Sequence, residues 1–209
     1  MILSVLIIIL AGYFLGNING AILISKFMVH DDVRTHGSGN AGFTNYYRNY
    51  GGMKSLLVAS IDFFKAAFAC LLGKFLLGKY GLSLEGGMIG ALAVTLGHDF
   101  PALYGFKGGK GILCGFAIGV VVDWKVAVIC FILFWVSYIP TKLVSLGSVI
   151  SALGFAIGFA LFHYDNLLVL IGGILLSALA VYMHRTNIQR LIQGKETKTD
   201  FFQKKGGKK

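Results

Sequence analysis

The chain has 209 residues, of which 56% are hydrophobic and only 13% are charged, and its mean hydropathy is +0.75. This composition excludes an ordinary water-soluble domain and predicts an all-α, polytopic membrane protein. The net charge of +10 is concentrated in part between Arg185 and Lys209, where attraction to anionic lipid contributes about 1 kcal/mol per basic residue. We therefore expect membrane lipid, and no nucleic acid, to be the partner of these charges.

The first apolar segment runs from about Ile2 to Ile24 and has no basic residue ahead of it. It lacks the n-region of a signal peptide and is predicted to be an uncleaved helix. Six further apolar segments follow, at residues 56–77, 86–104, 111–122, 126–139, 143–162 and 167–183. The segments 111–122 and 126–139 are shorter than the roughly 20 residues that a straight span needs. The segment lengths are therefore compatible with two topologies: seven spans, or five spans with two buried or re-entrant helices.

The distribution of basic residues decides between these topologies. With seven spans and the N-terminus outside, the inside segments 26–54, 98–111, 140–143 and 184–209 hold 15 of the 19 Lys and Arg residues. This is the asymmetry that the positive-inside rule describes. We predict seven transmembrane helices, some of them short, with the N-terminus outside and the C-terminus in the cytoplasm.

The first polar patch reads HGSGNAGFTNYYRNYG, residues 36–51. Its glycines free backbone N–H groups to converge on an anion, and its serine and asparagines add neutral donors. Arg48 supplies a rigid guanidinium suited to phosphate. A merely solvated connector is the alternative. The candidate site residues in this patch are Gly37, Ser38, Gly39, Asn40, Gly42, Thr44, Asn45 and Arg48.

Two charges lie inside the second span, Asp62 and Lys65. Each costs on the order of 2.5–3.5 kcal/mol at the centre of a membrane helix, so we expect the two charges to have a structural or functional role. At positions i and i+3 they share a face and can pair. A structural ion pair and a catalytic role are both open, and we assign the two residues a supporting role.

The second patch, GHDFPALYGFKGGKG, covers residues 97–111. Pro101 prevents a regular helix from continuing, and the glycines permit sharp turns, so an ordered loop is predicted at the inside face. It is not a P-loop, because Gly111 follows Lys110 where that motif needs a hydroxyl. The lysines could be positive-inside markers only, but their glycine context favours a bound phosphate. The candidates are His98, Lys107, Gly108, Gly109, Lys110 and Gly111.

The third patch, MHRTNIQRLIQGKETK, leaves the final span at residues 183–198. On a helix, His184, Asn187 and Arg190 recur at three-residue steps along one side, and Glu196 is assigned a supporting role. Ser145 belongs to a further inside segment, KLVSLGS. Because all these patches fall inside, we expect them to converge on one pocket at the cytoplasmic face.

The three patches resemble the signatures of the bacterial membrane family of acyl-phosphate-dependent glycerol-3-phosphate acyltransferases. SGNAGFTNYYR is similar to the first signature, GHDFPALYGFKGGKG to the second and HRTNIQRLIQGKETK to the third. The resemblance implies one transmembrane acyltransferase domain over residues 1–198, leaving 199–209 as a basic C-terminal tail. We also expect a monomer in the bacterial cytoplasmic (inner) membrane whose active site faces the cytoplasm.

The implied reaction is transfer of a fatty acyl group from acyl phosphate to the 1-hydroxyl of glycerol 3-phosphate, giving lysophosphatidate and phosphate. The resemblance gives Arg48, Lys107, Ser145, His184 and Asn187 to glycerol 3-phosphate. Acyl phosphate would be held by glycine amides near 37–42 and 108–111, with Ser38, Asn40 and Lys110. We take Ser38, Asn40, Arg48 and His184 as catalytic candidates, and the remaining patch residues, including Thr44, Asn45, His98 and Arg190, as substrate-binding.

Two groups could accept the proton of the attacking hydroxyl: a histidine, either His98 or His184, or the substrate's own phosphate. No cofactor is implied, and three cysteines, all within apolar spans, do not indicate a metal site. None of the five histidines has an aspartate five positions later, as other glycerolipid acyltransferases have, and there is no G-x-S-x-G motif.

Two other classes of protein compete with an acyltransferase. A membrane anion transporter also uses glycine-broken helices and basic helix ends, but its site lies near the midplane between repeated halves. The sequence has no internal repeat, and its polar residues gather at one face. A lipid-binding scaffold would explain the basic tail but not three glycine-rich patches.

Overall fold

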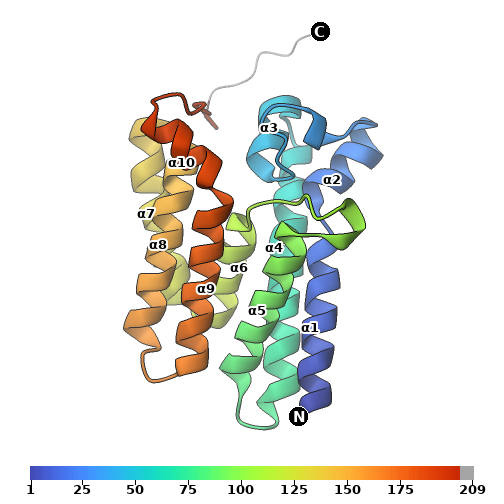
Figure 1. Cartoon of the computed structure of the whole chain (residues 1–209), viewed down its shortest axis with the longest axis vertical. Coiled ribbons are helices and arrows are strands. Elements are labelled where there is room, and N and C mark those ends of the chain that lie inside the picture. The colour runs from blue at the N-terminus through green and yellow to red at the C-terminus, as the bar shows by residue number, and fades with distance from the viewer. Residues whose placement is uncertain (203–209) are drawn as a thin grey trace.

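The computed structural model describes residues 1–202, and the regular structure within them is helical, as the composition predicts. The helices of the bundle lie side by side along the longest axis of the molecule (Figure 1). They are α1 (Ile2–Asn17), α4 (Lys54–Gly78), α5 (Ser83–Asp99), α6 (Ile112–Val122), α7 (Trp124–Thr141), α8 (Val144–Phe162) and α9 (Leu167–Met183). Of the predicted basic tail 199–209, residues 203–209 lie outside the described residues.

Short elements gather at one end of this bundle (Figure 1). They are α2 (Gly20–Ile24), a π-helical turn (Ser25–Val29), 3₁₀ turns at Val33–Thr35 and Ala102–Tyr104, α3 (Phe43–Tyr50) and α10 (Arg185–Ile192). The bundle has two sides: α1, α4 and α5 pack together, as do α7, α8 and α9, and α6 lies between them. The three polar patches of the sequence all lie at the end that carries the short elements.

By length and composition, four helical segments of the described chain could cross a membrane: Ile2–Val29, Lys54–Gly78, Trp124–Thr141 and Val144–Phe162. A fifth is counted if Leu167–Met183 and Arg185–Ile192, bent by 57°, form one span. The protein is thus a multi-pass membrane protein, and the helices α5 and α6 are too short to satisfy the length criterion.

Pro101 ends its helix as predicted: although the apolar segment runs to residue 104, α5 ends at Asp99, because Pro101 has no N–H group to donate and its ring blocks a regular helix. One helix boundary is corrected, since the segment expected at 126–139 is longer and α7 extends over 18 residues. The side chain of Asp123 caps this helix by accepting a hydrogen bond from the backbone of Lys125.

The first span is broken between α1 and α2, and a buried ionic cluster closes the break. Lys65 Nζ donates to the carbonyls of Gly16 (3.1 Å) and Ile18 (2.8 Å), whose usual helical partners are lost. It also lies 2.9 Å from Asp62 Oδ1 and 2.8 Å from His98 Nδ1. Asp62 and Lys65 therefore pair as their spacing predicts, and together they satisfy backbone groups that lipid could not.

Glycines allow α4 and α5 to pack with their backbones in contact. A Cβ placed on Gly73 would overlap the carbonyl group of Gly86, and a Cβ on Gly86 would overlap that of Gly73. Small residues at a helix contact allow close approach in membrane proteins, where van der Waals packing contributes much of the association energy. This contact fixes the position of α5, which ends at the candidate site.

We predict that Gly73→Ala lowers the thermal unfolding temperature in detergent. The overlap of the new Cβ with the carbonyl group of Gly86 costs more free energy than the higher helix propensity of alanine contributes. Gly78→Ala, in the same helix, is the matched control, since a Cβ there has no neighbour closer than 4.0 Å. It should leave stability equal or raise it by up to about 1 kcal/mol. Equal stability of the two variants would contradict the packing argument.

We predict that Lys65→Met lowers the free energy of unfolding by about 3–5 kcal/mol, because it leaves the Asp62 carboxylate buried without its cation. The double variant Asp62→Asn/Lys65→Met should recover part of this loss. Lys79→Met, at an exposed position, is the control. Unfolding of each variant in mixed detergent would be followed by circular dichroism, and a double variant no more stable than the single one would count against a charge-based role.

Candidate active site

A cavity of about 490 Å³ opens between the two sides of the bundle, and its polar end lies among the short elements. Five separate stretches of chain contribute polar side chains to it. Predicted residues that line it are Ser38, Asn40, Gly42, Thr44, Asn45, Arg48, Asp62, His98, Lys110, Gly111, Ser145, His184, Asn187 and Glu196. The convergence expected from the sequence is therefore present in space, while the roles of these residues as substrate ligands stay predictions.

The first loop is shaped from within by Asn45, which is 2% exposed. Its amide nitrogen donates to the carbonyls of Val33 (2.9 Å) and Asn40 (3.1 Å), and its Oδ1 accepts from the backbone of Ser38 (3.0 Å). Gly37 and Gly39 have φ of +57° and +70°, which glycine adopts without strain, and neither lines the cavity. Asn45 therefore holds Ser38 and Asn40 at the cavity wall.

The glycines of the second loop differ from the predicted anion cradle. The N–H of Gly108 donates to the carbonyl of Asp99 (3.2 Å), and that of Gly109 to the carbonyl of His98 (3.0 Å). A Cβ on Gly109 would overlap the imidazole of His98. These amides thus fasten the loop to the end of α5, and the expectation that they bind an anion is corrected. Lys107 is exposed and does not line the cavity.

The two loops also join each other. The backbone N–H of Ala41 donates to the carbonyl of Gly108 (3.3 Å), and the carbonyl of Ala41 accepts from the side chain of Asn19 (3.0 Å) at the break in the first span. The position of the first loop therefore depends on that break.

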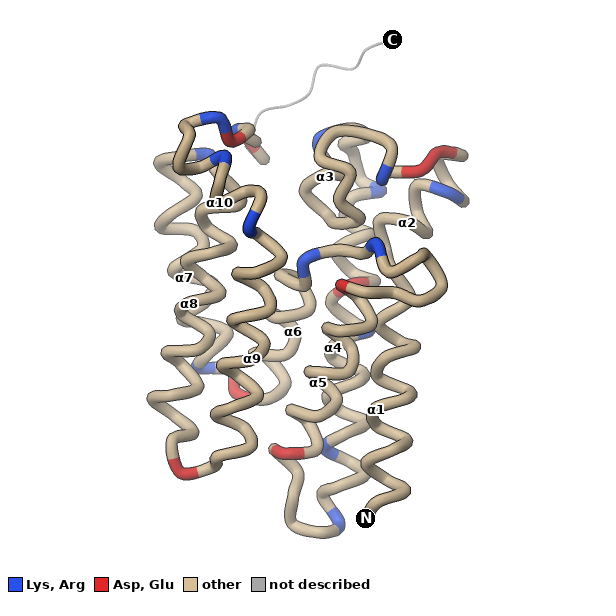
Figure 2. The backbone as a smooth tube through the Cα atoms, viewed as in Figure 1, with Lys and Arg blue, Asp and Glu red and all other residues tan. Residues whose placement is uncertain are grey.

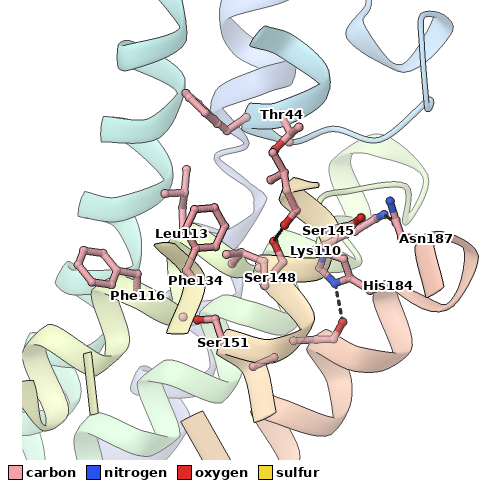
Figure 3. A pocket seen from close by; sticks show the side chains of 18 of the residues that line it. Thr44, Lys110, Leu113, Phe116, Phe134, Ser145, Ser148, Ser151, His184 and Asn187 are labelled. Carbon is pink, nitrogen blue, oxygen red and sulfur yellow. Dashed lines mark hydrogen bonds between the residues drawn. The ribbon is translucent and has the colours of Figure 1, made fainter. Parts of the chain in front are cut away.

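A chain of polar contacts runs along one side of the cavity from the second loop to α10. Lys110 Nζ donates to Asn187 Oδ1, Asn187 Nδ2 donates to Glu196 Oε1 (2.9 Å), and Arg190 Nε donates to Glu196 Oε2 (2.7 Å). Arg190 thus contacts Glu196 and does not line the cavity. Figure 3 shows Lys110, Asn187, His184 and Ser145 gathered on one side of the pocket.

Burial and nearby charges shift the pKa values of Lys110 and Glu196. Burial, helped by the nearby Arg190, lowers the pKa of Lys110 to about 8. Burial alone would raise the pKa of Glu196, but the hydrogen bonds from Arg190 and Asn187 outweigh it and hold that pKa below its usual range. Glu196 therefore offsets only part of the positive charge that Arg48, Lys110 and Arg190 bring to this end of the cavity.

His184 lies at the bend between α9 and α10. Its Nδ1 is 2.8 Å from the carbonyl of Ala180, which can only accept, so Nδ1 carries the hydrogen and Nε2 is the unprotonated nitrogen of the neutral ring. The other predicted histidine, His98, contacts Lys65 through Nδ1 and belongs to the ionic cluster of the broken span.

Away from the polar end the cavity wall is apolar, which the sequence analysis did not anticipate. Figure 3 shows Leu113, Phe116 and Phe134 on the side opposite to Lys110. The apolar lining also includes Phe131, Trp135, Phe155 and Leu176. Ser145, Ser148 and Ser151 line the cavity from one face of α8. Their three-residue spacing within an apolar helix was the sequence signal that could have revealed this face.

A cationic end that continues into an apolar cavity, within a multi-pass helical bundle, defines an integral membrane protein whose site fits an amphiphilic anion. Comparison with known proteins agrees with this class. Residues 6–194 match the family described as Glycerol-3-phosphate acyltransferase. The chain therefore belongs to the glycerol-3-phosphate acyltransferase family.

Individual relatives cover nearly the whole chain. It is 40% identical over 186 residues to a glycerol-3-phosphate acyltransferase of Finegoldia magna, covering 89% of this chain and 91% of the relative. It is 35% identical over 198 residues to a glycerol-3-phosphate acyltransferase of Clostridioides difficile, covering 94% of this chain and 96% of the relative.

Two solved structures share the fold. The crystal structure of PlsY (YgiH), an integral membrane glycerol 3-phosphate acyltransferase, in its glycerol 3-phosphate form has a TM-score of 0.87 and 31% identity over 96% of this chain and 100% of that chain. The lysophosphatidic acid form has a TM-score of 0.83 and 30% identity, covering 94% of this chain and 96% of that chain.

We predict that anion affinity at this site falls as pH rises through about 8, because Lys110 then loses the proton that gives it a positive charge. Binding favours the charged lysine, so affinity is full below this pH and declines above it. Sulfate is the suitable probe because its own charge is constant in this range. Calorimetry between pH 7 and 10 should show the decline, and Lys110→Arg should remove it. If the decline persists in Lys110→Arg, a group other than Lys110 causes it, and the prediction is wrong.

Proposed function

We propose that the protein transfers a fatty acyl group from acyl phosphate to the 1-hydroxyl of glycerol 3-phosphate, giving lysophosphatidate and inorganic phosphate. The observation that carries this proposal is the continuity of the cavity, whose cationic end at Arg48 and Lys110 leads into an apolar wall of phenylalanines. Acyl phosphate and lysophosphatidate have the same two parts, a phosphate and an acyl chain. Family membership and the substrate and product forms of the solved relatives support the proposal.

Arg48, Ser145, His184 and Asn187 face the cavity together and bind the phosphate of glycerol 3-phosphate. A guanidinium presents donors in a planar fork that matches a phosphate, and charge-assisted bonds of this kind are the strong ones. Lys107, which the family resemblance adds to this set, lies outside the cavity lining.

The chemistry needs no nucleophile from the protein, because acyl phosphate is a mixed anhydride with a good leaving group. The 1-hydroxyl oxygen of glycerol 3-phosphate attacks the acyl carbonyl carbon, and the bond from that carbon to the phosphate oxygen breaks. Phosphate leaves with the electron pair, and the hydroxyl proton passes to a phosphate oxygen. The protein orients the two substrates and stabilises the developing oxyanion, with Ser38, Asn40 and Lys110 as donors.

We also propose the topology of seven spans, with the N-terminus outside and the site facing the cytoplasm of a bacterial inner membrane. Figure 2 shows that most Lys and Arg residues of the described chain lie at the end that holds α2, α3 and α10. The positive-inside rule places that end in the cytoplasm. The helices α5 and α6 then act as short spans whose ends are completed by the second loop. An anion transporter fits less well, because the polar residues gather at this one end.

The test is turnover by the purified protein in detergent with palmitoyl phosphate and glycerol 3-phosphate, and with palmitoyl-CoA as the parallel donor. We expect equal amounts of lysophosphatidate and phosphate from acyl phosphate alone. Arg48→Ala should lower kcat/KM by roughly 100-fold or more, as expected when bonds between an ion and phosphate are lost. Arg185→Ala, at an exposed arginine, is the matched control.

Absence of turnover by folded protein would overturn the proposed reaction. Flux of glycerol 3-phosphate into liposomes would then support the transporter. Turnover with palmitoyl-CoA and none with palmitoyl phosphate would keep the family but replace the donor.

A further inference from the structure

The described chain continues past the part that matches the family, which ends at residue 194. Residues 197–202, here called the C-terminal strap, pass from the end of α10 to both α7 and α3. Phe201 lines the cavity. The strap therefore connects the two sides of the bundle across the polar end of the cavity.

The backbone of the strap is fastened to the end of α7. Tyr138 Oη donates to the carbonyl of Thr199 (2.9 Å) and accepts from the N–H of Phe201 (2.9 Å). The N–H of Thr199 donates to the carbonyl of Lys142 (2.9 Å), and Lys142 Nζ lies 3.5 Å from Asp200 Oδ1. Tyr138 is fully buried. The strap is thus held at consecutive residues by a rigid helix end.

An aromatic cluster joins the strap to α3. The ring centroid of Phe201 lies 5.8 Å from that of Phe43, 5.2 Å from that of Tyr47 and 5.1 Å from that of Tyr138. These separations are in the range of favourable aromatic pairs. Phe201 therefore packs between α3 and α7 as part of the cavity roof.

The strap also reaches Arg48, the arginine of α3. Arg48 Nε donates to Thr199 Oγ1 (2.5 Å), and Arg48 Nη2 donates to the carbonyl of Thr197 (2.8 Å). Both acceptors are neutral, so they orient the guanidinium without cancelling its charge. A carboxylate in the same place would pair with the charge and compete with a phosphate. Thr199 is 6% exposed, so water does not easily replace its hydroxyl.

We propose that Thr199 is a positioning residue: it holds the Arg48 guanidinium at the cavity, so that the phosphate of glycerol 3-phosphate meets an ordered cation. This inference rests on the proposed function, which gives that phosphate to Arg48. A flexible arginine loses side-chain freedom when it binds, and an arginine already ordered by the strap loses less. The strap thereby strengthens binding of the acceptor substrate without touching it.

The experiment compares KM values for glycerol 3-phosphate and for palmitoyl phosphate in the full chain. Thr199→Val keeps the size of the side chain and removes the hydroxyl; we expect KM for glycerol 3-phosphate to rise on the order of tenfold and KM for palmitoyl phosphate to stay unchanged. Thr199→Ser restores the hydroxyl and should restore the wild-type KM. Thr186→Val, at an exposed threonine of α10, is the matched control.

Several outcomes would overturn the inference. They are an unchanged KM for glycerol 3-phosphate in Thr199→Val, an equal rise in both KM values, or failure of Thr199→Ser to rescue. A lower KM or higher kcat in Thr199→Val, or in a chain truncated after Lys198, would show that the strap is an inhibitory latch. If Thr199→Val elutes as aggregate, Thr199→Ala is measured in its place with the same expectation.

Arg48→Ala separates failure of this inference from failure of the proposed function. If Arg48→Ala raises KM for glycerol 3-phosphate and Thr199→Val does not, the inference fails and the function stands. If Arg48→Ala has no effect, the assignment of Arg48 in the proposed function fails. In an Arg48→Ala background, Thr199→Val should have no further effect on KM, because the two residues act as one unit. Should the wild type show no turnover, calorimetric binding of glycerol 3-phosphate to the same variants decides the positioning role.

Discussion

The arrangement of the site depends on the way Lys65 closes the break in the first membrane span. A backbone break within a bilayer leaves carbonyl groups that lipid cannot satisfy, and here the lysine donates to the carbonyls of Gly16 and Ile18 while Asp62 neutralises its charge. The break lets the chain turn at α2, and the side chain of Asn19 at the same point holds the first loop through Ala41. This cluster therefore helps to fix the position of the first loop over the cavity, together with the bond from Ala41 to Gly108.

From that point the site is assembled by contacts between segments distant in the sequence. Ala41 bonds to Gly108, Lys110 to Asn187 and Asn187 to Glu196, so the three polar patches form one connected unit. Glu196 offsets only part of the positive charge of Arg48, Lys110 and Arg190. A partly buried excess of positive charge is unfavourable in the empty protein, and a bound phosphate relieves it. The same electrostatics that cost stability therefore favour an anionic substrate.

The apolar part of the cavity explains why such a site belongs in a membrane. Phenylalanines of α6, α7 and α8 line it below the polar end, so the acyl chain of the proposed donor would pass from lipid to an equally apolar wall. The phosphate of the proposed acceptor would meet the opposite, charged end. The C-terminal strap lies where these two environments meet, with Phe201 on the apolar side and Thr199 against the guanidinium of Arg48.

The sequence by itself determined the membrane class, the approximate helices, the loop after Pro101 and the polar residues that would converge, because hydropathy, proline and charge act locally. It did not determine where the donors of the second loop would bond: Gly108 and Gly109 looked like an anion cradle, yet their N–H groups bond to the end of α5. It also did not reveal that Phe155 faces a cavity, or that Thr199 reaches Arg48. Those facts depend on which segments meet after folding, and tertiary packing alone decided them.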